Sequence, residues 1–177
     1  MLSKILVVDF EDSFTYNIAS VLHEYCPENI TIAVVSHEQF FEKNYFSTIL
    51  SYSEKIGVIL GPGPGHPNEY SEYFPQIKQL FLKENFFLMG ICLGHQILGL
   101  MEGYEIDYCD RPIHGESVDF LFQNKLYQVQ KYNSLCVKKG EEVFDLLEGR
   151  NWISYQFHPE SIGTTNNIDF FKTLLNF

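Results

Sequence analysis

The residue best placed to do chemistry in this sequence is Cys92, at the centre of Gly90-Ile-Cys-Leu-Gly94. An apolar run from Phe86 ends at the cysteine, and apolar residues then recur at helical spacing, which predicts a buried strand that turns directly into a helix. Glycines two residues before and after Cys92 would relieve the crowding in such a turn. The opening turn of a helix favours a thiolate, and its free N–H groups can receive an oxyanion. On this pattern alone Cys92 is either a nucleophile or a small apolar residue of a core strand.

A nucleophilic thiol needs a base, and that base needs a partner to fix its tautomer. His158 is the strongest candidate base, because a strand predicted over 152–157 would deliver it to the sheet edge and Glu160 follows two residues later. Cys92, His158 and Glu160 could therefore act as nucleophile, base and orienting carboxylate. His95 is a weaker candidate base, because three residues after Cys92 in a helix it would point away from the sulfur.

The elements that would position these residues indicate an α/β fold. Further buried strands are predicted at 4–10, 30–35 and 56–60, helices at 71–82 and 168–177, and a helix capped by Asp12 and Ser13 after the first strand. Strands that alternate with helices favour a mostly parallel central sheet, whose sites lie at the carboxyl ends of the strands. Four short strands between 104 and 137 favour a small antiparallel extension.

The strand predicted at 56–60 runs directly into the loop Gly61-Pro-Gly-Pro-Gly-His-Pro67. A single Pro-Gly pair would indicate a plain turn, but three glycines alternating with prolines make a stiffer loop. Such a loop can hold backbone N–H groups in fixed directions and allow a ligand to approach closely. It lacks the Lys-Ser/Thr ending of a phosphate loop, so nucleotide binding is not predicted.

Composition excludes several classes of function. The formal net charge of −11 disfavours nucleic acid and anionic membranes as partners. No apolar run reaches the length of a bilayer span, so a cytoplasmic protein is the simplest expectation. The 4 cysteines are scattered and form neither a zinc motif nor a disulfide framework, and we expect no metal or cofactor. The 16 phenylalanines and 11 tyrosines are expected to fill the core.

Three motifs occur in a characteristic order: the loop at 61–67, the turn around Cys92, and Gln156-Phe-His-Pro-Glu-Ser161. Together they resemble the class I (triad-type) glutamine amidotransferases. Asp12-Ser-Phe-Thr-Tyr-Asn17 further resembles the amidotransferase component of anthranilate synthase and of 4-amino-4-deoxychorismate synthase. The resemblance spans nearly the whole chain, and it implies a three-layer, flavodoxin-like α/β fold with one amidotransferase domain over 1–177.

The resemblance also implies an activity, which is hydrolysis of L-glutamine through a γ-glutamyl thioester on Cys92. The ammonia would pass to a separate, chorismate-binding synthase subunit. His158 would accept the thiol proton and give one to the departing ammonia, while Glu160 orients it. The backbone N–H groups of Leu93 and of the Gly63 region would stabilise the oxyanion. The glutamine-binding positions of the family correspond to Gly63, Gly65, Gln96, Ser134 and Leu135.

The sequence also departs from the pattern of that family. Asn133 stands where the family usually has a histidine, and the spans 114–132 and 134–158 look shorter than in typical relatives, each by about a hairpin. We expect these changes to spare the triad and to alter the surface that docks the synthase. Two other readings stay open: a free-standing γ-glutamyl hydrolase that is fully active without a partner, and a catalytically idle regulatory subunit.

Overall fold

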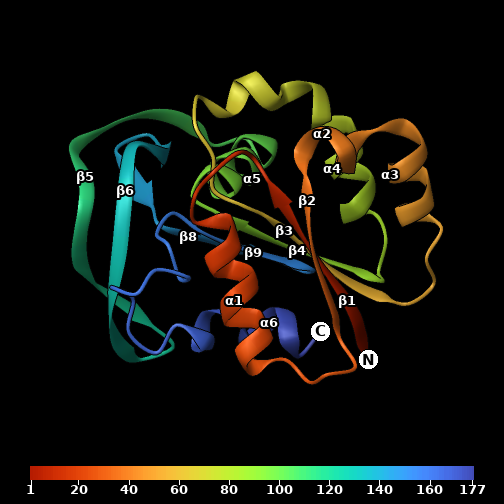
Figure 1. The fold of residues 1–177 in the computed structure, drawn as a ribbon. Coiled ribbons are helices and arrows are strands. Elements are labelled where there is room, and N and C mark those ends of the chain that lie inside the picture. Colours follow the sequence, from red (N-terminus) through yellow and green to blue (C-terminus); the bar gives the residue numbers. More distant parts are fainter.

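The computed structural model describes residues 1–177 and confirms the predicted α/β fold. The central sheet contains β1 (Leu2–Asp9), β2 (Thr31–Ser36), β3 (Lys55–Leu60), β4 (Phe86–Ile91), β8 (Leu146–Gly149) and β9 (Trp152–Tyr155). Their order across the sheet is β2-β1-β3-β4-β9-β8 (Figure 1). All neighbouring pairs are parallel except β8, which is antiparallel to β9 at one edge. The sheet is therefore mostly parallel, as the sequence predicted.

Helices cover both faces of this sheet, and each face has its own apolar cluster. α1 (Thr15–Tyr25) and α6 (Ile168–Leu175) contribute to one cluster. α2 (His37–Phe41), α3 (Lys43–Leu50), α4 (Phe74–Phe81) and α5 (Leu93–Met101) contribute to the other. Successive side chains of a strand point to opposite faces, so the neighbours Val7 and Val8 belong to different clusters. All six residues of β4 are buried, which explains why its sequence is a continuous apolar run.

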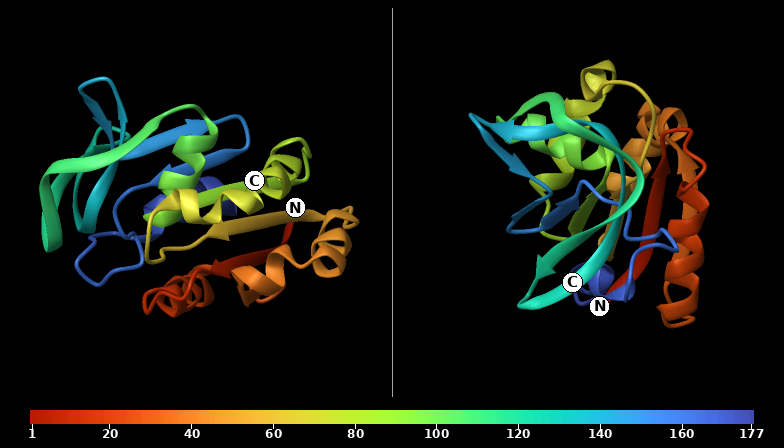
Figure 2. Two further views of the ribbon diagram at one scale, coloured as in Figure 1. Left: turned by 90° about the horizontal axis from the view of Figure 1, so that it is seen from above. Right: turned by 90° about the vertical axis from the view of Figure 1, so that its left-hand side faces the viewer.

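A second, antiparallel sheet contains β5 (Glu105–Phe122), β6 (Lys125–Lys139) and β7 (Glu142–Phe144). The hairpin of β5 and β6 lies beyond the carboxyl ends of the central parallel strands (Figures 1 and 2). The antiparallel extension is confirmed, but the prediction of four short strands was wrong. The chain forms two long strands, and the pairing shifts register between Tyr108 and Ile113 instead of ending.

Local differences from the predicted elements have identifiable causes. The helix predicted at 71–82 is a 3₁₀ helix, η1 (Pro67–Tyr73), followed by α4, which has a proline near its N-terminus. The cap predicted from Asp12 and Ser13 was wrong, because α1 begins after Phe14. The Asp12 carboxylate instead accepts a hydrogen bond of 2.8 Å from the Phe14 N–H. The sequence pattern did not predict α2 and α3. None of the helices is both long and apolar enough to cross a membrane.

We expect Gly94→Ala to destabilise the protein by about 2–3 kcal/mol, the upper part of the range for an overpacked core. A methyl group on Gly94 would collide with the backbone carbonyl of Leu60 in β3, which cannot rotate away. Urea denaturation of the variant measures this loss. Gly99→Ala in the same helix is the matched control, because the closest neighbour of its methyl group would be the side chain of Val137. A loss no larger in Gly94→Ala than in Gly99→Ala would contradict the close approach of helix and strand.

Candidate active site

Cys92 lies at a strained turn between β4 and α5. Its backbone angles are φ 53° and ψ −100°, in the region that favours glycine, although it carries a side chain. Its N–H donates a 2.9 Å hydrogen bond to the carbonyl of Tyr155 at the end of β9. A methyl group on Gly90 would lie 2.7 Å from the backbone of Gly94, so the turn closes only with glycine at position 90, and Gly94 is required by its contact with Leu60. The predicted strand-to-helix turn is confirmed, and it exposes the sulfur at the sheet edge.

His158 and Glu160 form a buried pair just beyond β9. The two residues are 2% and 4% exposed, and the Nδ1–H of His158 donates to a carboxylate oxygen of Glu160 at 2.7 Å. The backbone N–H of His158 donates to Gln130 O at 2.8 Å, and the Thr164 hydroxyl donates to the His158 carbonyl at 2.7 Å. These contacts fix the tautomer and the orientation of the imidazole.

Two aromatic rings complete the environment of this imidazole. Phe14 and Tyr132 each lie 5.2 Å from the His158 ring, measured between ring centroids. Phe14 follows the first strand, whereas Tyr132 comes from β6, so segments far apart in the chain exclude water from the imidazole together. Neither residue was predicted to have a role at the site, because nothing in the sequence pattern indicates which aromatic side chain will pack there.

Opposing effects determine the charge of His158. Burial lowers its pKa, but the Glu160 carboxylate, the hydrogen bond to it and the neighbouring Cys92 sulfur outweigh burial and raise the pKa to about 11. Because Nδ1 is bonded to Glu160, the ring's other nitrogen, Nε2, is the atom available to Cys92. That nitrogen is buried and makes no hydrogen bond within the chain, so it is free to exchange a proton at the sulfur. The geometry therefore suits an imidazolium held beside the sulfur.

His95, the weaker candidate base, is fully buried and turned away from this pair. One ring nitrogen, Nδ1, lies 2.9 Å from the Ser154 hydroxyl, and the other, Nε2, lies 2.9 Å from the Phe144 carbonyl. A carbonyl can only accept, so Nε2 carries the hydrogen and the Ser154 hydroxyl donates to Nδ1. Burial lowers the pKa of His95 to about 4, so the ring is neutral near pH 7. His95 connects α5 to neighbouring segments, consistent with the expectation that it points away from Cys92.

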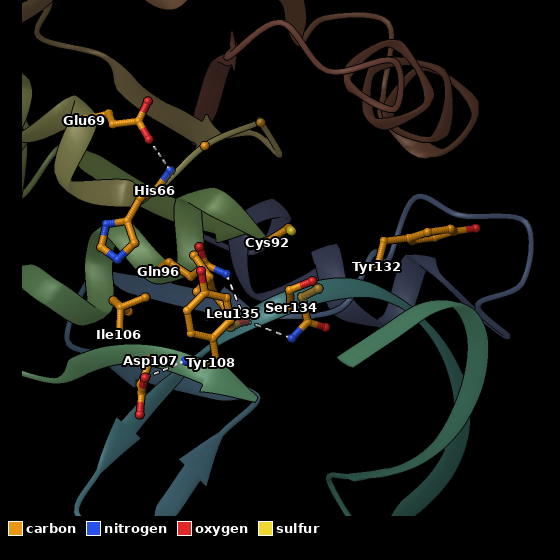
Figure 3. Close-up of a pocket in the computed structure, with 13 residues that line it drawn as sticks. His66, Glu69, Cys92, Gln96, Ile106, Asp107, Tyr108, Tyr132, Ser134 and Leu135 are labelled. Carbon is orange, nitrogen blue, oxygen red and sulfur yellow. Dashed lines mark hydrogen bonds between the residues drawn. The ribbon is translucent and has the colours of Figure 1, made fainter. Parts of the chain in front are cut away.

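A pocket of about 470 Å³ opens in front of Cys92 (Figure 3). Its lining comes from the glycine-proline loop, the first turns of α5, and the strands β5 and β6. The lining residues are Gly63, Gly65, His66, Glu69, Cys92, Gln96, Ile106, Asp107, Tyr108, Tyr132, Asn133, Ser134 and Leu135. Five positions matched to glutamine binding, namely Gly63, Gly65, Gln96, Ser134 and Leu135, thus lie around one cavity.

Leu93 contributes to this region through its backbone. Its side chain is 1% exposed and belongs to the core, while its N–H begins α5 and has no acceptor within the helix. A methyl group on Gly63 would lie 2.5 Å from the Leu93 side chain and 2.5 Å from Phe10. The loop therefore packs against the helix start so closely that only glycine fits. This brings the two backbone segments matched to an oxyanion site next to each other.

Gln96 and Ser134 are held in place by polar contacts. The Gln96 side-chain amide donates to the carbonyl of Leu135 at 3.2 Å, and Figure 3 shows it on the pocket wall between Cys92 and Leu135. The hydroxyl of Ser134 lies 3.1 Å from Nε2 of His114, a residue of β5. Gln96 is 4% exposed, so it is not a solvated surface amide.

Gln156 is a site residue that sequence reasoning missed. Its side chain is completely buried, donates from Nε2 to the Cys92 sulfur at 3.8 Å, and accepts from Gln96 at 3.2 Å. A long polar side chain between the aromatic residues Tyr155 and Phe157, in a segment predicted to be a buried strand, was the available signal.

Comparisons with known proteins agree with this geometry. The family model described as "Glutamine amidotransferase class-I" matches residues 6–176. A Schizosaccharomyces pombe protein described as a candidate aminodeoxychorismate synthase is 30% identical over 98% of this chain, but the chain spans only 26% of that protein. The anthranilate synthase component 2 of Cyanophora paradoxa is 30% identical, over 97% of this chain and 98% of its own length.

A solved structure shows the same fold. It is that of a candidate GMP synthase subunit from Thermoplasma acidophilum, with a TM-score of 0.76 and 18% sequence identity. The alignment covers 99% of this chain and 94% of the other. The family match across almost the entire chain is the decisive finding, and this chain therefore belongs to the class I glutamine amidotransferases.

Proposed function

We propose that this chain hydrolyses the side-chain amide of glutamine through a thioester on Cys92 and supplies the ammonia to a chorismate-binding synthase subunit. One observation carries the catalytic part of the proposal. Cys92 stands on a strained turn at the mouth of the pocket, and the buried pair of His158 and Glu160 lies beside it. A nucleophile, a base and an orienting carboxylate in this arrangement suit acyl transfer.

In the proposed first half-reaction, the Cys92 sulfur attacks the amide carbon of glutamine and a carbon–sulfur bond forms. Negative charge then develops on the amide oxygen, where the N–H of Leu93 and one from the Gly63 region would receive it. Removing one such donor costs about 3–4 kcal/mol in other enzymes. His158 transfers a proton from Nε2 to the amide nitrogen, the carbon–nitrogen bond breaks, and ammonia leaves.

In the second half-reaction, water attacks the thioester carbon while Nε2 of His158 takes one of its protons. The carbon–sulfur bond breaks, the sulfur regains its negative charge, and glutamate leaves, its new γ-carboxyl group releasing the second proton of the water to solvent. Glu160 keeps Nδ1 of His158 protonated throughout, so Nε2 alternates between donor and acceptor. No cofactor is required for either step.

Substrate recognition in this proposal relies on neutral groups of the pocket. Free glutamine presents an α-ammonium and an α-carboxylate, which need acceptors and donors respectively. The side chains of Gln96 and Ser134, with the backbone of Gly63, Gly65 and Leu135, can supply both kinds of partner.

The names of related proteins support the second part of the proposal, the identity of the ammonia acceptor. Relatives in anthranilate and aminodeoxychorismate synthesis cover most of this chain at 28–30% identity. We therefore propose a chorismate-binding subunit that uses ammonia to make anthranilate or 4-amino-4-deoxychorismate.

The test is glutamate release by the purified chain, measured alone and with each chorismate-binding subunit encoded in the same genome. We expect one subunit to stimulate hydrolysis strongly, because docking orders the site and commits the ammonia to a tunnel. The aromatic product formed with that subunit distinguishes anthranilate from 4-amino-4-deoxychorismate. A high rate for the chain alone, unchanged by every subunit, would instead establish a free-standing γ-glutamyl hydrolase.

A further inference from the structure

Gln156 is a buried polar residue at the site that the proposed reaction does not use. It follows β9 and precedes His158 by two residues, and its backbone N–H donates to the carbonyl of Asp145 at 2.9 Å. We propose that Gln156 is a further catalytic residue, whose side-chain amide donates a hydrogen bond to the Cys92 sulfur and connects that sulfur to Gln96 in the pocket wall. This inference rests on the proposed function, since it concerns the same nucleophile.

The direction of this amide chain is determined by a backbone carbonyl. Gln96 must turn its NH₂ group toward the oxygen of Leu135, because a carbonyl can only accept. The same NH₂ group donates its second hydrogen to the side-chain oxygen of Gln156. Gln156 is thereby left with its own NH₂ group facing the sulfur of Cys92. Reversing either amide would place two oxygens, or two NH₂ groups, against each other in a buried site.

A hydrogen bond from Gln156 favours the charged form of the sulfur. Hydrogen bonds to an ionised acceptor are about twice as strong as neutral ones, so the amide stabilises the thiolate more than the thiol or the thioester. The stabilised thiolate is both the attacking species and the leaving group when water cleaves the thioester. Gln156 therefore assists both the attack of the sulfur on the amide and the release of the sulfur when the thioester is cleaved.

His158 cannot provide this assistance by itself. The imidazole must give up and regain a proton at Nε2 during each turnover, so its contact with the sulfur changes. An amide does not titrate near neutral pH, and Gln156 can keep donating to the sulfur whichever protonation state His158 has. Because Gln156 is completely buried, no water competes for that contact.

The amide chain also connects the nucleophile to the pocket. Gln96 lines the cavity, so a ligand that accepts or donates a hydrogen bond there polarises the amide of Gln156 in turn. An occupied pocket would thereby strengthen the donor at the sulfur. Gln156 thus couples substrate binding to the activation of Cys92.

Alkylation by iodoacetamide tests this role without requiring glutamine turnover. Mass spectrometry follows the peptide that contains Cys92, and the half-buried Cys26 in the same sample serves as an internal reference. Gln156→Met has a similar length but no donor. We expect its Cys92 to react about 10- to 100-fold more slowly, as for the loss of a hydrogen bond to a charged group. The kcat for glutamine should fall by a similar factor while KM changes little.

Two further variants separate this role from mere packing. Gln156→Glu keeps the side-chain shape and the acceptor for Gln96, and it should slow Cys92 alkylation even if Gln156→Met folds poorly. Gln76→Met is the matched control, because it removes a half-buried amide donor, to Phe41 O at 2.7 Å, that does not line the pocket. Gln76→Met should change neither the rate of Cys92 alkylation nor the kcat for glutamine.

Undiminished alkylation of Cys92 in either folded Gln156 variant would overturn the inference. Slower alkylation in a protein that hydrolyses no glutamine would retain the role of Gln156 toward Cys92 and reject only glutamine as the substrate. The two proposals therefore fail in distinguishable ways.

Discussion

Cys92→Ala is expected to lose glutamine hydrolysis by about 10⁵-fold or more, comparable to the loss of a nucleophile in other triad enzymes. Alanine cannot form the thioester, and no other thiol can replace it. Of the four cysteines, only Cys92 is among the residues that line the pocket. Glutamate release measures the loss of hydrolysis. The mass of the intact protein after brief exposure to glutamine measures the loss of the thioester.

The same variant distinguishes the proposed function from a regulatory role. In complex with the synthase subunit, Cys92→Ala should abolish product formation from glutamine but preserve product formation from added ammonia, because only the ammonia supply is lost. Cys26→Ala is the matched control and should leave both activities intact. Glutamine-dependent activity that survives in the Cys92→Ala complex would reject the thioester mechanism and favour an idle regulatory subunit.

Local sequence pattern predicts the turn around Cys92 well, because the constraint is itself local. Gly90 is required by its contact with Gly94 and His95 in the same turn, and the apolar run of β4 reflects burial on both faces. Gly94 also meets the Leu60 carbonyl of β3, which the local pattern does not show. The same holds for the short loop after β3, whose glycines and prolines limit the backbone directly. Both features can therefore be recognised without knowledge of the tertiary structure.

The approach of His158 to Cys92 depends instead on strand order, which periodicity does not contain. β9 pairs with β4, with Tyr155 opposite Ile91, across more than sixty intervening residues. Residue chemistry made His158 and Glu160 candidates to act on Cys92, and the family resemblance supported that grouping, but neither showed which strands bring the residues together. Gln156, which contacts the Cys92 sulfur, and Phe14, whose ring packs against His158, were missed for the same reason, because both contacts join segments far apart in the chain.

The antiparallel hairpin shows a further limit of sequence pattern. Alternation along β5 is interrupted where its pairing with β6 shifts register, so the sequence indicated separate short strands. The long strand that forms nevertheless matters for the site, since Ile106, Asp107 and Tyr108 from β5 line the pocket opposite Cys92. None of these three residues carries a pattern that marks a binding role.

Glu160→Gln is expected to lower kcat by about 10²- to 10⁴-fold, the range of a general acid–base contribution. The substitution keeps the size of the side chain and an acceptor for Nδ1–H, but it removes the negative charge. Burial then dominates and the pKa of His158 falls from its value of about 11, so the imidazolium beside Cys92 is lost. Glutamine hydrolysis under saturating substrate measures the effect.

The positive charge on His158 should also affect the free energy of unfolding of the protein. The folded pKa of His158 lies above its unfolded value of about 6.5, so its contribution is complete below pH 6.5 and is lost as pH rises toward about 11. Other groups titrate in this window, and the informative quantity is therefore the difference in unfolding free energy between the wild-type protein and Glu160→Gln. That difference should be largest at pH 5–6.5 and narrow steadily toward pH 10. A difference that does not change with pH would show that Glu160 orients His158 without holding it protonated. His158 would then be neutral in the resting site.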